Sequence, residues 1–306
     1  MPSRTILYVF AGRRENLEIA LPYYRDILNR NPDTEVHIWD LSQRDRTGAN
    51  HRYLASIETS DRLKVRTEFY GNFSTSRGQA LVWKHYGESR YADCTFVKID
   101  DDVLFLDTKN FKEFVRRARR RPDVVTSALT INNGASTELI PALRDGYRKL
   151  DIPLLDVHLS ADYAEMCHRW FLDNWRDVVD QPGKVQAADS WLSINCIAYS
   201  HAVGRTIGDL IGQLSPETIA GREFPRVANG RRVYPKIGDE GAVNMQRVAI
   251  DTGFTVSHFG FGPQVNLNRT DGPVLSAETQ AELRAAYAAL AEVYLHHSEH
   301  VHVAGA

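Results

Sequence analysis

The chain has 306 residues, of which 43% are hydrophobic and 25% are charged, and its formal net charge is −2. This composition is typical of a water-soluble globular protein with a sizeable core, and it excludes binding to nucleic acid or anionic membrane through overall charge. No apolar run approaches the roughly 20 residues that a membrane-spanning helix needs. The first apolar run, residues 6–11, is too short for a signal peptide and is followed by Arg13 and Arg14. We therefore expect a cytosolic protein without a membrane partner.

The three cysteines, Cys94, Cys167 and Cys196, are far apart and odd in number. They show none of the paired spacing that marks a disulfide framework or a structural zinc site. We expect all three to be small buried hydrophobic side chains.

Short β-branched runs alternate with helical patterns through the N-terminal half of the chain. The predicted strands span residues 6–10, 35–39, 63–69, 95–99 and 124–128, and the predicted helices span residues 15–29, 77–88 and 108–120. Such alternation implies βαβ units and a mostly parallel sheet. In sheets of this kind, ligands bind beyond the carboxyl ends of the strands.

The second half is less regular. Residues 132–156 are rich in turn-forming residues and are expected to be loops, and residues 216–238, dense in Pro, Gly and Arg, are expected to form a long loop or a small hairpin. Helices are predicted at residues 163–179, 203–211, 242–249 and 276–297, with a strand at residues 193–199. Because there is no internal repeat or low-complexity linker, we expect one α/β domain over residues 1–306, with a mostly parallel mixed central sheet flanked by helices.

The strongest chemical signal is Asp100-Asp101-Asp102, three consecutive acids with apolar residues on both sides. This pattern predicts that the acids lie at a strand end and are held rigidly. Adjacent like charges are costly unless a cation compensates them, and carboxylate oxygens prefer hard ions. In an extended segment, Asp100 and Asp102 point one way and Asp101 the other. We therefore expect Asp100 and Asp102 to bind Mn²⁺ or Mg²⁺, with Asp101 contacting a ribose or a positive side chain.

An Asp-x-Asp motif that follows an apolar strand resembles that of the GT-A class of glycosyltransferases, and the order of elements extends the resemblance over about residues 5–260. The resemblance implies a GT-A-like domain, a nucleotide-sugar donor (a UDP-sugar is expected) and a divalent metal on the donor diphosphate. It also implies that Phe10, Ala11, Arg13 and Asp40 hold the nucleoside. The implied division of the chain is a nucleotide-sugar-binding half at residues 1–130, an acceptor-binding half at residues 131–275, and a C-terminal helix and tail at residues 276–306.

Asp239 and Glu240 lie between glycines just before the predicted helix at residues 242–249. Inverting GT-A enzymes carry an acidic base at a similar point, so the resemblance implies that one of these acids deprotonates the acceptor hydroxyl. The chain has Asp-Glu where a common family pattern is Glu-Asp, and we favour Asp239 over Glu240. A carboxylate near a helix N-terminus stays ionised, as a base must at neutral pH. The alternative is a helix cap with an acidic first turn.

Two further residues fit the resemblance by their order in the chain. His258 lies between a strand-like run and flexible glycines, where many GT-A enzymes have a third metal ligand, and imidazole suits Mn²⁺. A structural histidine is the alternative. Arg77 opens the predicted helix before the acidic strand, where a cation could meet the donor diphosphate. A surface arginine is equally consistent with this position.

The densest basic run covers residues 116–121 and contains Arg116, Arg117, Arg119, Arg120 and Arg121. Such a run usually forms one solvated helix face. Alternatively it contacts the phosphates of a DNA acceptor, as in glycosyltransferases that modify hydroxymethylated bases of phage DNA, where the base would have to be flipped out. The histidines at the end of the chain, His296, His297, His300 and His302, are assigned no site.

The sequence therefore predicts a metal-dependent glycosyltransferase, transferring a hexose or pentose from a nucleoside-diphosphate sugar to a hydroxyl of DNA, a saccharide or a small molecule. Three alternatives stay open. One is a metal-dependent nucleotidyltransferase or phosphohydrolase that uses the same acids, and another is a non-catalytic nucleic-acid-binding protein that uses the arginine run. The third is a degenerate transferase that binds the donor without turnover. The donor, the acceptor, inversion or retention, and the oligomeric state are not specified by the sequence.

Overall fold

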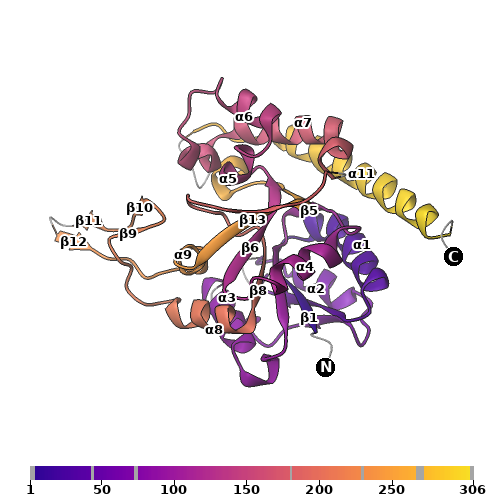
Figure 1. Cartoon of the computed structure of the whole chain (residues 1–306), viewed down its shortest axis with the longest axis horizontal. Helices are drawn as coiled ribbons and strands as arrows, with labels where there is room; N and C mark the ends of the chain where they lie inside the picture. Colours follow the sequence, from indigo (N-terminus) through magenta and orange to yellow (C-terminus); the bar gives the residue numbers. More distant parts are fainter. Residues whose placement is uncertain are drawn as a thin grey trace.

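The computed structural model of the chain describes residues 4–42, 45–71, 75–179, 181–228, 231–266 and 272–303. At its centre is a mixed β-sheet flanked by helices (Figure 1). Across the sheet, the strands follow the order β3 (Leu63–Arg66), β2 (Thr34–Asp40), β1 (Thr5–Ala11), β4 (Thr95–Asp100), β8 (Cys196–Ser200), β6 (Val124–Ile131), β13 (Arg247–His258) and β5 (Val103–Leu106). A short strand, β7 (Val185–Ala187), also pairs with β13.

Parallel pairing joins β3, β2, β1 and β4, and joins β6 to β13. β8 runs antiparallel between β4 and β6, and β5 and β7 are antiparallel to β13. Every residue of β1 and of β6 is buried. Strands that are covered on both faces read as continuous apolar runs, which explains why these strands were visible in the sequence.

The helices cover the sheet and its ends. They are α1 (Arg14–Arg30), α2 (Ala49–Ser56), α3 (Thr75–Tyr86), α4 (Phe111–Arg119), α5 (Gly134–Thr137), α6 (Pro141–Tyr147), α7 (Ala161–Val179), α8 (His201–Leu210), α9 (Asp239–Asn244), α10 (Gly262–Val265) and α11 (Ala277–Val303), with 3₁₀ turns at Ser89–Tyr91 and Leu154–Leu159. The long helix α11 packs against α1, α7 and β5. The side chains of His297, His300 and His302 lie outside the described part of the chain.

Residues 214–228 and 231–236 leave the body of the molecule as an arm, seen at the left of Figure 1. An antiparallel bridge between Leu214 and Lys236 closes its base. Two small hairpins form the arm, one from β9 (Thr218–Ile219) and β10 (Arg222–Glu223), the other from β11 (Arg226–Ala228) and β12 (Arg231–Val233). The hairpin alternative expected for this segment is therefore confirmed.

The strand order reverses beside β1. From β1 the chain moves outward to β2 and then β3, and it returns to the other side of β1 to form β4. A crevice for a ligand opens at such a switch point, beyond the carboxyl ends of the two diverging strands. Here those ends are Ala11 and Asp100, which places the acidic triplet at this crevice.

The triplet itself connects two distant parts of the sheet. β4 ends at Asp100 and β5 begins at Val103, yet β5 pairs with β13 and not with β4. Val103 pairs with His258 at the end of β13, and the Phe259 N–H donates to the Asp102 carbonyl oxygen at 2.7 Å. The end of β13 is thereby held beside the acids by main-chain pairing.

The structure confirms the α/β class and the predicted strands of the N-terminal half, and it corrects two other expectations. The helix predicted at residues 242–249 ends at Asn244, because residues 247–250 pair with β6 and β7 instead. Residues 132–156, expected to be loops, contain α5 and α6. The sequence analysis also missed β5 and α2.

Cys94, Cys167 and Cys196 are buried and unpaired, as predicted. In the described part of the chain, no helix is both long enough and apolar enough to span a bilayer.

A close approach of two glycines fixes an irregularity in β13. The register of β13 against β6 shifts between Asp251 and Thr255. A Cβ on Gly253 would lie 2.4 Å from the Cα of Gly183, a backbone contact that no side-chain rotation relieves. Arg117 also stabilises this part of β13, because its guanidinium donates hydrogen bonds to the Asp251 carboxylate at 2.6 Å and to the Gly253 carbonyl oxygen at 3.2 Å.

We therefore expect Gly253→Ala to lower the free energy of unfolding by about 1–3 kcal/mol, as overpacking of a tight site does. Urea denaturation followed by circular dichroism measures this change. Gly208→Ala in α8 is the matched control, because its Cβ would meet the Trp83 backbone at an ordinary 3.5 Å. Within a helix that substitution should be neutral or stabilising by up to about 1 kcal/mol. An equal loss in both variants would contradict the role given to the glycine contact.

Candidate functional site

Asp101 fastens the acidic turn to the end of β1. Its Oδ2 accepts the main-chain N–H groups of Gly12 and Arg13 at 2.7 and 2.9 Å, and its Oδ1 accepts the Arg13 Nε at 3.0 Å and a second guanidinium nitrogen. Asp101 was expected to contact a ribose or a positive side chain, and in the structure it contacts the positive side chain of Arg13. Since its side chain is turned toward β1, the carboxylates of Asp100 and Asp102 are free to face elsewhere.

Asp100, Asp102 and His258 come together, and we call these three residues the metal-ligand cluster. Each offers one ligand atom, and the three atoms lie within 4.8 Å of one another. His258 Nε2 lies 3.3 Å from Asp102 Oδ2. The side chains of Asp102 and His258 are almost fully buried. The arrangement predicted from the sequence for these three residues is thus present in the structure.

The cluster fits a hard divalent cation. Among the described residues, Asp102 Oδ1 and His258 Nδ1 are buried and have no hydrogen-bond partner. A buried polar atom without a partner is costly, so these atoms indicate a missing ligand. Two carboxylates and an imidazole form a donor set that Mn²⁺ accepts readily.

Two protein cations compensate part of the negative charge. Lys98, fully buried within β4, donates to Asp100 and to the Ile194 carbonyl oxygen, and Arg13 Nη1 lies 2.9 Å from Asp102 Oδ2. Burial alone would raise the pKa of Asp102, but Arg13 and His258 reverse that effect and hold it below the ordinary value. By formal charge, the three carboxylates of the acidic triplet face the two cations Lys98 and Arg13, which leaves one negative charge to attract a metal ion.

A cleft of about 560 Å³ opens beside the cluster at the switch point. Phe10, Ala11 and Arg13, predicted to hold a nucleoside, line it, together with Gly12 and Asp101. Residues that were not selected from the sequence complete the walls: Glu15, Asn16, Leu41, Ser42, Gln79, Phe259, Gly262, Val265, Asn266, Gln280 and Arg284. We call this space the donor-side cleft.

Arg284 brings a cation to this cleft from the C-terminal helix. Its guanidinium lies 4.4 Å from the centre of the Phe259 ring, and its Nε donates to Asn16 Oδ1 at 3.0 Å. The Nδ2 of Asn16 is buried and has no partner among the described residues. Sequence pattern gave no signal for either residue, because α11 reaches the cleft only by packing against α1.

Asp40 and Arg77, which were also predicted to bind the donor, do not line the donor-side cleft. The Asp40 carboxylate is buried; it accepts Ser42 N and Oγ at 3.0 and 2.6 Å and lies 2.5 Å from His51 Nδ1. Ser42 lines the cleft, so Asp40 stands behind it. Arg77 is exposed in the first turn of α3, whereas Gln79 two residues later reaches the cleft wall.

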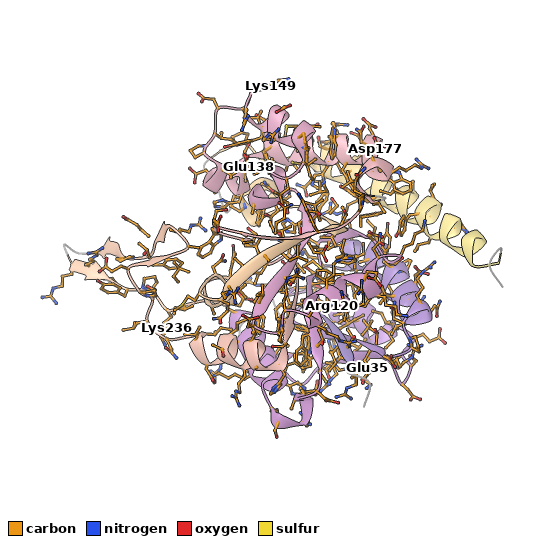
Figure 2. The ribbon with its side chains drawn as sticks, in the orientation of Figure 1. Glu35, Arg120, Glu138, Lys149, Asp177 and Lys236 are labelled. Atoms are coloured by element: carbon orange, nitrogen blue, oxygen red, sulfur yellow. The ribbon has the colours of Figure 1, made fainter. Side chains whose placement is uncertain are left out.

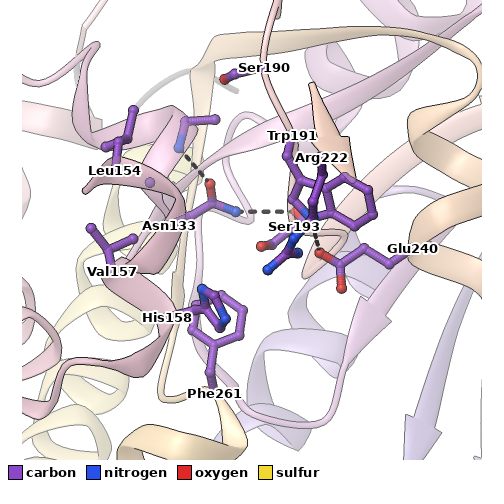
Figure 3. Close-up of a pocket in the computed structure, with 12 residues that line it drawn as sticks. Asn133, Leu154, Val157, His158, Ser190, Trp191, Ser193, Arg222, Glu240 and Phe261 are labelled. Carbon is purple, nitrogen blue, oxygen red and sulfur yellow. Dashed lines mark hydrogen bonds between the residues drawn. The ribbon is translucent and has the colours of Figure 1, made fainter. Parts of the chain in front are cut away.

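A second, smaller pocket of about 90 Å³ lies on the other side of the loop that follows β13 (Figure 3). Phe259 and Gly262 of this loop line the donor-side cleft, and Phe261 lines the small pocket. The Phe261 ring lies 4.5 Å from the His258 ring, so the pocket borders the metal-ligand cluster. We call it the acceptor-side pocket; its other lining residues are Asn133, Gly134, Ala135, Leu154, Val157, His158, Ser190, Trp191, Ser193, Arg222 and Glu240.

Glu240, and not Asp239, lines the acceptor-side pocket. The Trp191 indole N–H donates to Glu240 Oε1 at 2.5 Å and fixes the carboxylate (Figure 3). Burial raises the pKa of Glu240 above its ordinary value, although the indole hydrogen bond opposes this. Asp239 begins α9 and accepts the Glu240 N–H at 2.9 Å. It is close enough to contribute to the raised pKa of Lys98.

A chain of amides links this pocket to the cluster. Asn195 Nδ2 lies 3.4 Å from Asp100 Oδ2, and Asn133 Nδ2 donates to Asn195 Oδ1 at 3.1 Å. Asn133 in turn lines the pocket and caps α5. The position of Asp100 is therefore tied to one wall of the acceptor-side pocket.

The basic run at residues 116–121 is not brought to this site. Arg119 donates to Thr95 and Thr5, which begin β4 and β1, whereas the acids follow the other end of β4. Six residues of extended chain separate the two ends by roughly 17–20 Å. Arg117 is engaged with Asp251 and Arg116 with Glu113. Arg120 follows α4 directly and is exposed; Figure 2 labels its position.

Comparison with known proteins adds no identification. No protein-family description matches the sequence, and neither does any curated protein sequence.

The cluster predicts a specific loss on substitution. Asp102→Asn removes one charge from the ligand set while nearly preserving shape, and we expect it to weaken Mn²⁺ binding by more than the roughly 10–100-fold that loss of an outer-shell partner costs. Titration calorimetry with Mn²⁺ measures the affinity, and circular dichroism checks the fold. Asp209→Asn, at an exposed position of α8, is the matched control and should bind Mn²⁺ like the unmodified chain. Equal affinity of the Asp102 variant and the unmodified chain would remove the metal site.

Proposed function

We propose that the protein is a metal-dependent glycosyltransferase that moves a sugar from a nucleoside-diphosphate sugar to an acceptor hydroxyl. The observation that carries the proposal is the convergence of Asp100, Asp102 and His258 at the switch point of the sheet, where neighbouring residues line two cavities. The larger cavity has Arg13 and Arg284 in its wall beside the carboxylates of Glu15 and Asp101, and the smaller one is lined by the Glu240 carboxylate and by Arg222. A two-substrate transfer needs both kinds of space on either side of one reacting centre. The GT-A-like topology and its division into two halves are part of this proposal.

The donor-side cleft suits a nucleotide-sugar in size and charge. Its volume of about 560 Å³ falls within the range of roughly 300–1,000 Å³ typical of ligand pockets. Arg284 lies in its wall 3.9 Å from Glu15, and Arg13 lies there paired with Asp101 and Asp102. Guanidinium groups bind phosphates through paired hydrogen bonds, so we assign Arg284 and Arg13 to the donor phosphates. Asp100, Asp102 and His258 would hold Mn²⁺ or Mg²⁺, which when bound supplies positive charge to the donor diphosphate.

On the acceptor side, Glu240 is the residue we assign as base. In a direct displacement, the acceptor hydroxyl oxygen forms a bond to the sugar C1 while the bond from C1 to the diphosphate oxygen breaks. The electron pair of that bond leaves with the diphosphate, and the hydroxyl proton passes to the Glu240 carboxylate. The hydrogen bond from Trp191 keeps one Glu240 oxygen occupied, so the other oxygen takes the proton. This assignment replaces the preference for Asp239 that the sequence suggested.

Metal-dependent phosphoester chemistry at the same acids remains an alternative, and it would use nucleoside triphosphates or phosphoesters in place of nucleotide-sugars. The alternative of DNA binding through residues 116–121 has less support, because this run lies at the opposite end of β4 from the acids. A DNA acceptor in the glycosyltransferase reading would have to enter from another side of the molecule.

The test compares Glu240→Gln with Asp239→Asn in an assay of nucleoside-diphosphate release from a nucleotide-sugar with Mn²⁺ and acceptor. Loss of a general base costs about 10²–10⁴-fold in turnover, so Glu240→Gln should lose that much while its affinity for donor stays unchanged. Asp239→Asn should lose less than about tenfold, since Asp239 is assigned no proton transfer. The reverse ranking would return the base to Asp239, and normal transfer by both variants would favour a retaining reaction.

The pH dependence follows from the raised pKa of Glu240. The base works only as a carboxylate, so turnover should fall as pH drops through the folded-state pKa of this residue. Because burial raises that pKa, the acid limb of kcat should lie above the ordinary value of 4.5. An acid limb at or below that value, measured in the unmodified enzyme, would speak against Glu240 as the base.

A further inference from the structure

Arg222 has no assigned role in the transfer, although it lines the acceptor-side pocket. It belongs to β10 of the arm, and its guanidinium lies 4.9 Å from the centre of the Trp191 ring. Its guanidinium takes part in no salt bridge or hydrogen bond with the described residues, although its charge lowers the pKa of Glu240. A half-buried guanidinium with five N–H donors and no protein acceptor is available to an external anion.

Trp191 holds the cation and the base apart. One part of the indole stacks under the Arg222 guanidinium, while its N–H binds Glu240. Arg222 and Glu240 therefore line one pocket without forming an ion pair, and both charges stay available. In Figure 3, Trp191, Arg222 and Glu240 stand on one side of the pocket, and Leu154 and Val157 face them from the other.

The arm that carries Arg222 is itself basic. Residues 214–236 contain five cations (Arg222, Arg226, Arg231, Arg232 and Lys236) and two acids (Glu217 and Glu223), a net charge of +3 in a chain whose net charge is −2. Arg231, Arg232 and Lys236 are exposed, and Lys236 marks the base of the arm in Figure 2. A local positive field of this kind raises the concentration of anions near the pocket.

We infer that the acceptor carries an anionic group, a carboxylate or a phosphate, which Arg222 binds while the acceptor hydroxyl faces Glu240. This inference rests on the proposed function for the identity of the pocket. A planar guanidinium binds either group through two parallel hydrogen bonds, and its stacking on Trp191 fixes the plane in advance. An anionic acceptor would also neutralise Arg222. The guanidinium would then bind the acceptor and would not pair with the base, Glu240.

The experiment measures binding of matched probe pairs to the full chain by titration calorimetry. The carboxylate pair is p-nitrophenyl glucuronide and p-nitrophenyl glucoside, and the phosphate pair is glucose 6-phosphate and glucose. A charge-assisted hydrogen bond predicts that the anionic member of at least one pair binds about tenfold more tightly or better. The pair with the larger preference identifies carboxylate or phosphate as the group.

The variants locate the preference. Arg222→Gln should abolish it and Arg222→Lys should retain part of it, because a point charge remains without the planar fork. Arg231→Gln, which removes an exposed cation of the same arm, is the matched control and should retain the full preference. No preference in either pair, or no binding of any anionic probe, would overturn the inference. An equal loss in the Arg231 variant would also overturn it, because the arm would then attract anions only through its general field.

Failure of the proposed function is distinguishable from failure of this inference. If nucleotide-sugars with Mn²⁺ do not bind but the Arg222-dependent preference is present, the pocket is an anion site of a protein with another activity. If they bind and the preference is absent, the transferase remains and its acceptor is neutral.

Discussion

The fold is organised around three consecutive carboxylates that are buried at the joint between β4 and β5. Burying like charges is costly, and the structure offsets the cost with Arg13 from the end of β1 and Lys98 from within β4. The Asp101 carboxylate accepts a hydrogen bond from the end of β1 and so connects β4 to β1. The Asp100 and Asp102 carboxylates lie beside His258 at the end of β13. These charged groups hold the ends of β1, β4 and β13 together. Their summed formal charge is still negative.

Both cavities depend on the same arrangement. The loop after β13 contributes Phe259 to the donor-side cleft and Phe261 to the acceptor-side pocket, so one short segment separates the two. His168 stabilises the loop that follows β13 through hydrogen bonds to the Phe259 carbonyl oxygen at 2.7 Å and to the Tyr287 hydroxyl at 2.8 Å. Because His168 belongs to α7 and Tyr287 to α11, these two helices support the position of the loop that follows β13, although they lie far from the acids in sequence.

The elements and residues predictable from sequence were those with a local signal. Short runs rich in apolar and β-branched residues marked β1, β4 and β6, and the apolar flanks of Asp100 and Asp102 marked a strand end. His258 was found through its order in the chain, and pairing of β13 with β5 then brings it beside Asp102. Arg284, Trp191 and Arg222 were not found as site residues, because only long-range packing brings them to the cavities. The helix predicted beyond Asn244 was wrong since pairing with β6 overrides the local preference of residues 247–249.

The most direct test of the central claim is a thermal-shift screen of UDP-, GDP-, TDP- and CMP-sugars, each with and without Mn²⁺. A ligand at about 100 times its dissociation constant adds roughly 2.7 kcal/mol to the free energy of unfolding, which is readily seen as a higher melting temperature. The account predicts a rise that requires both one nucleotide-sugar and Mn²⁺. No rise with any nucleotide-sugar, together with a rise for nucleoside triphosphates or DNA, would contradict it.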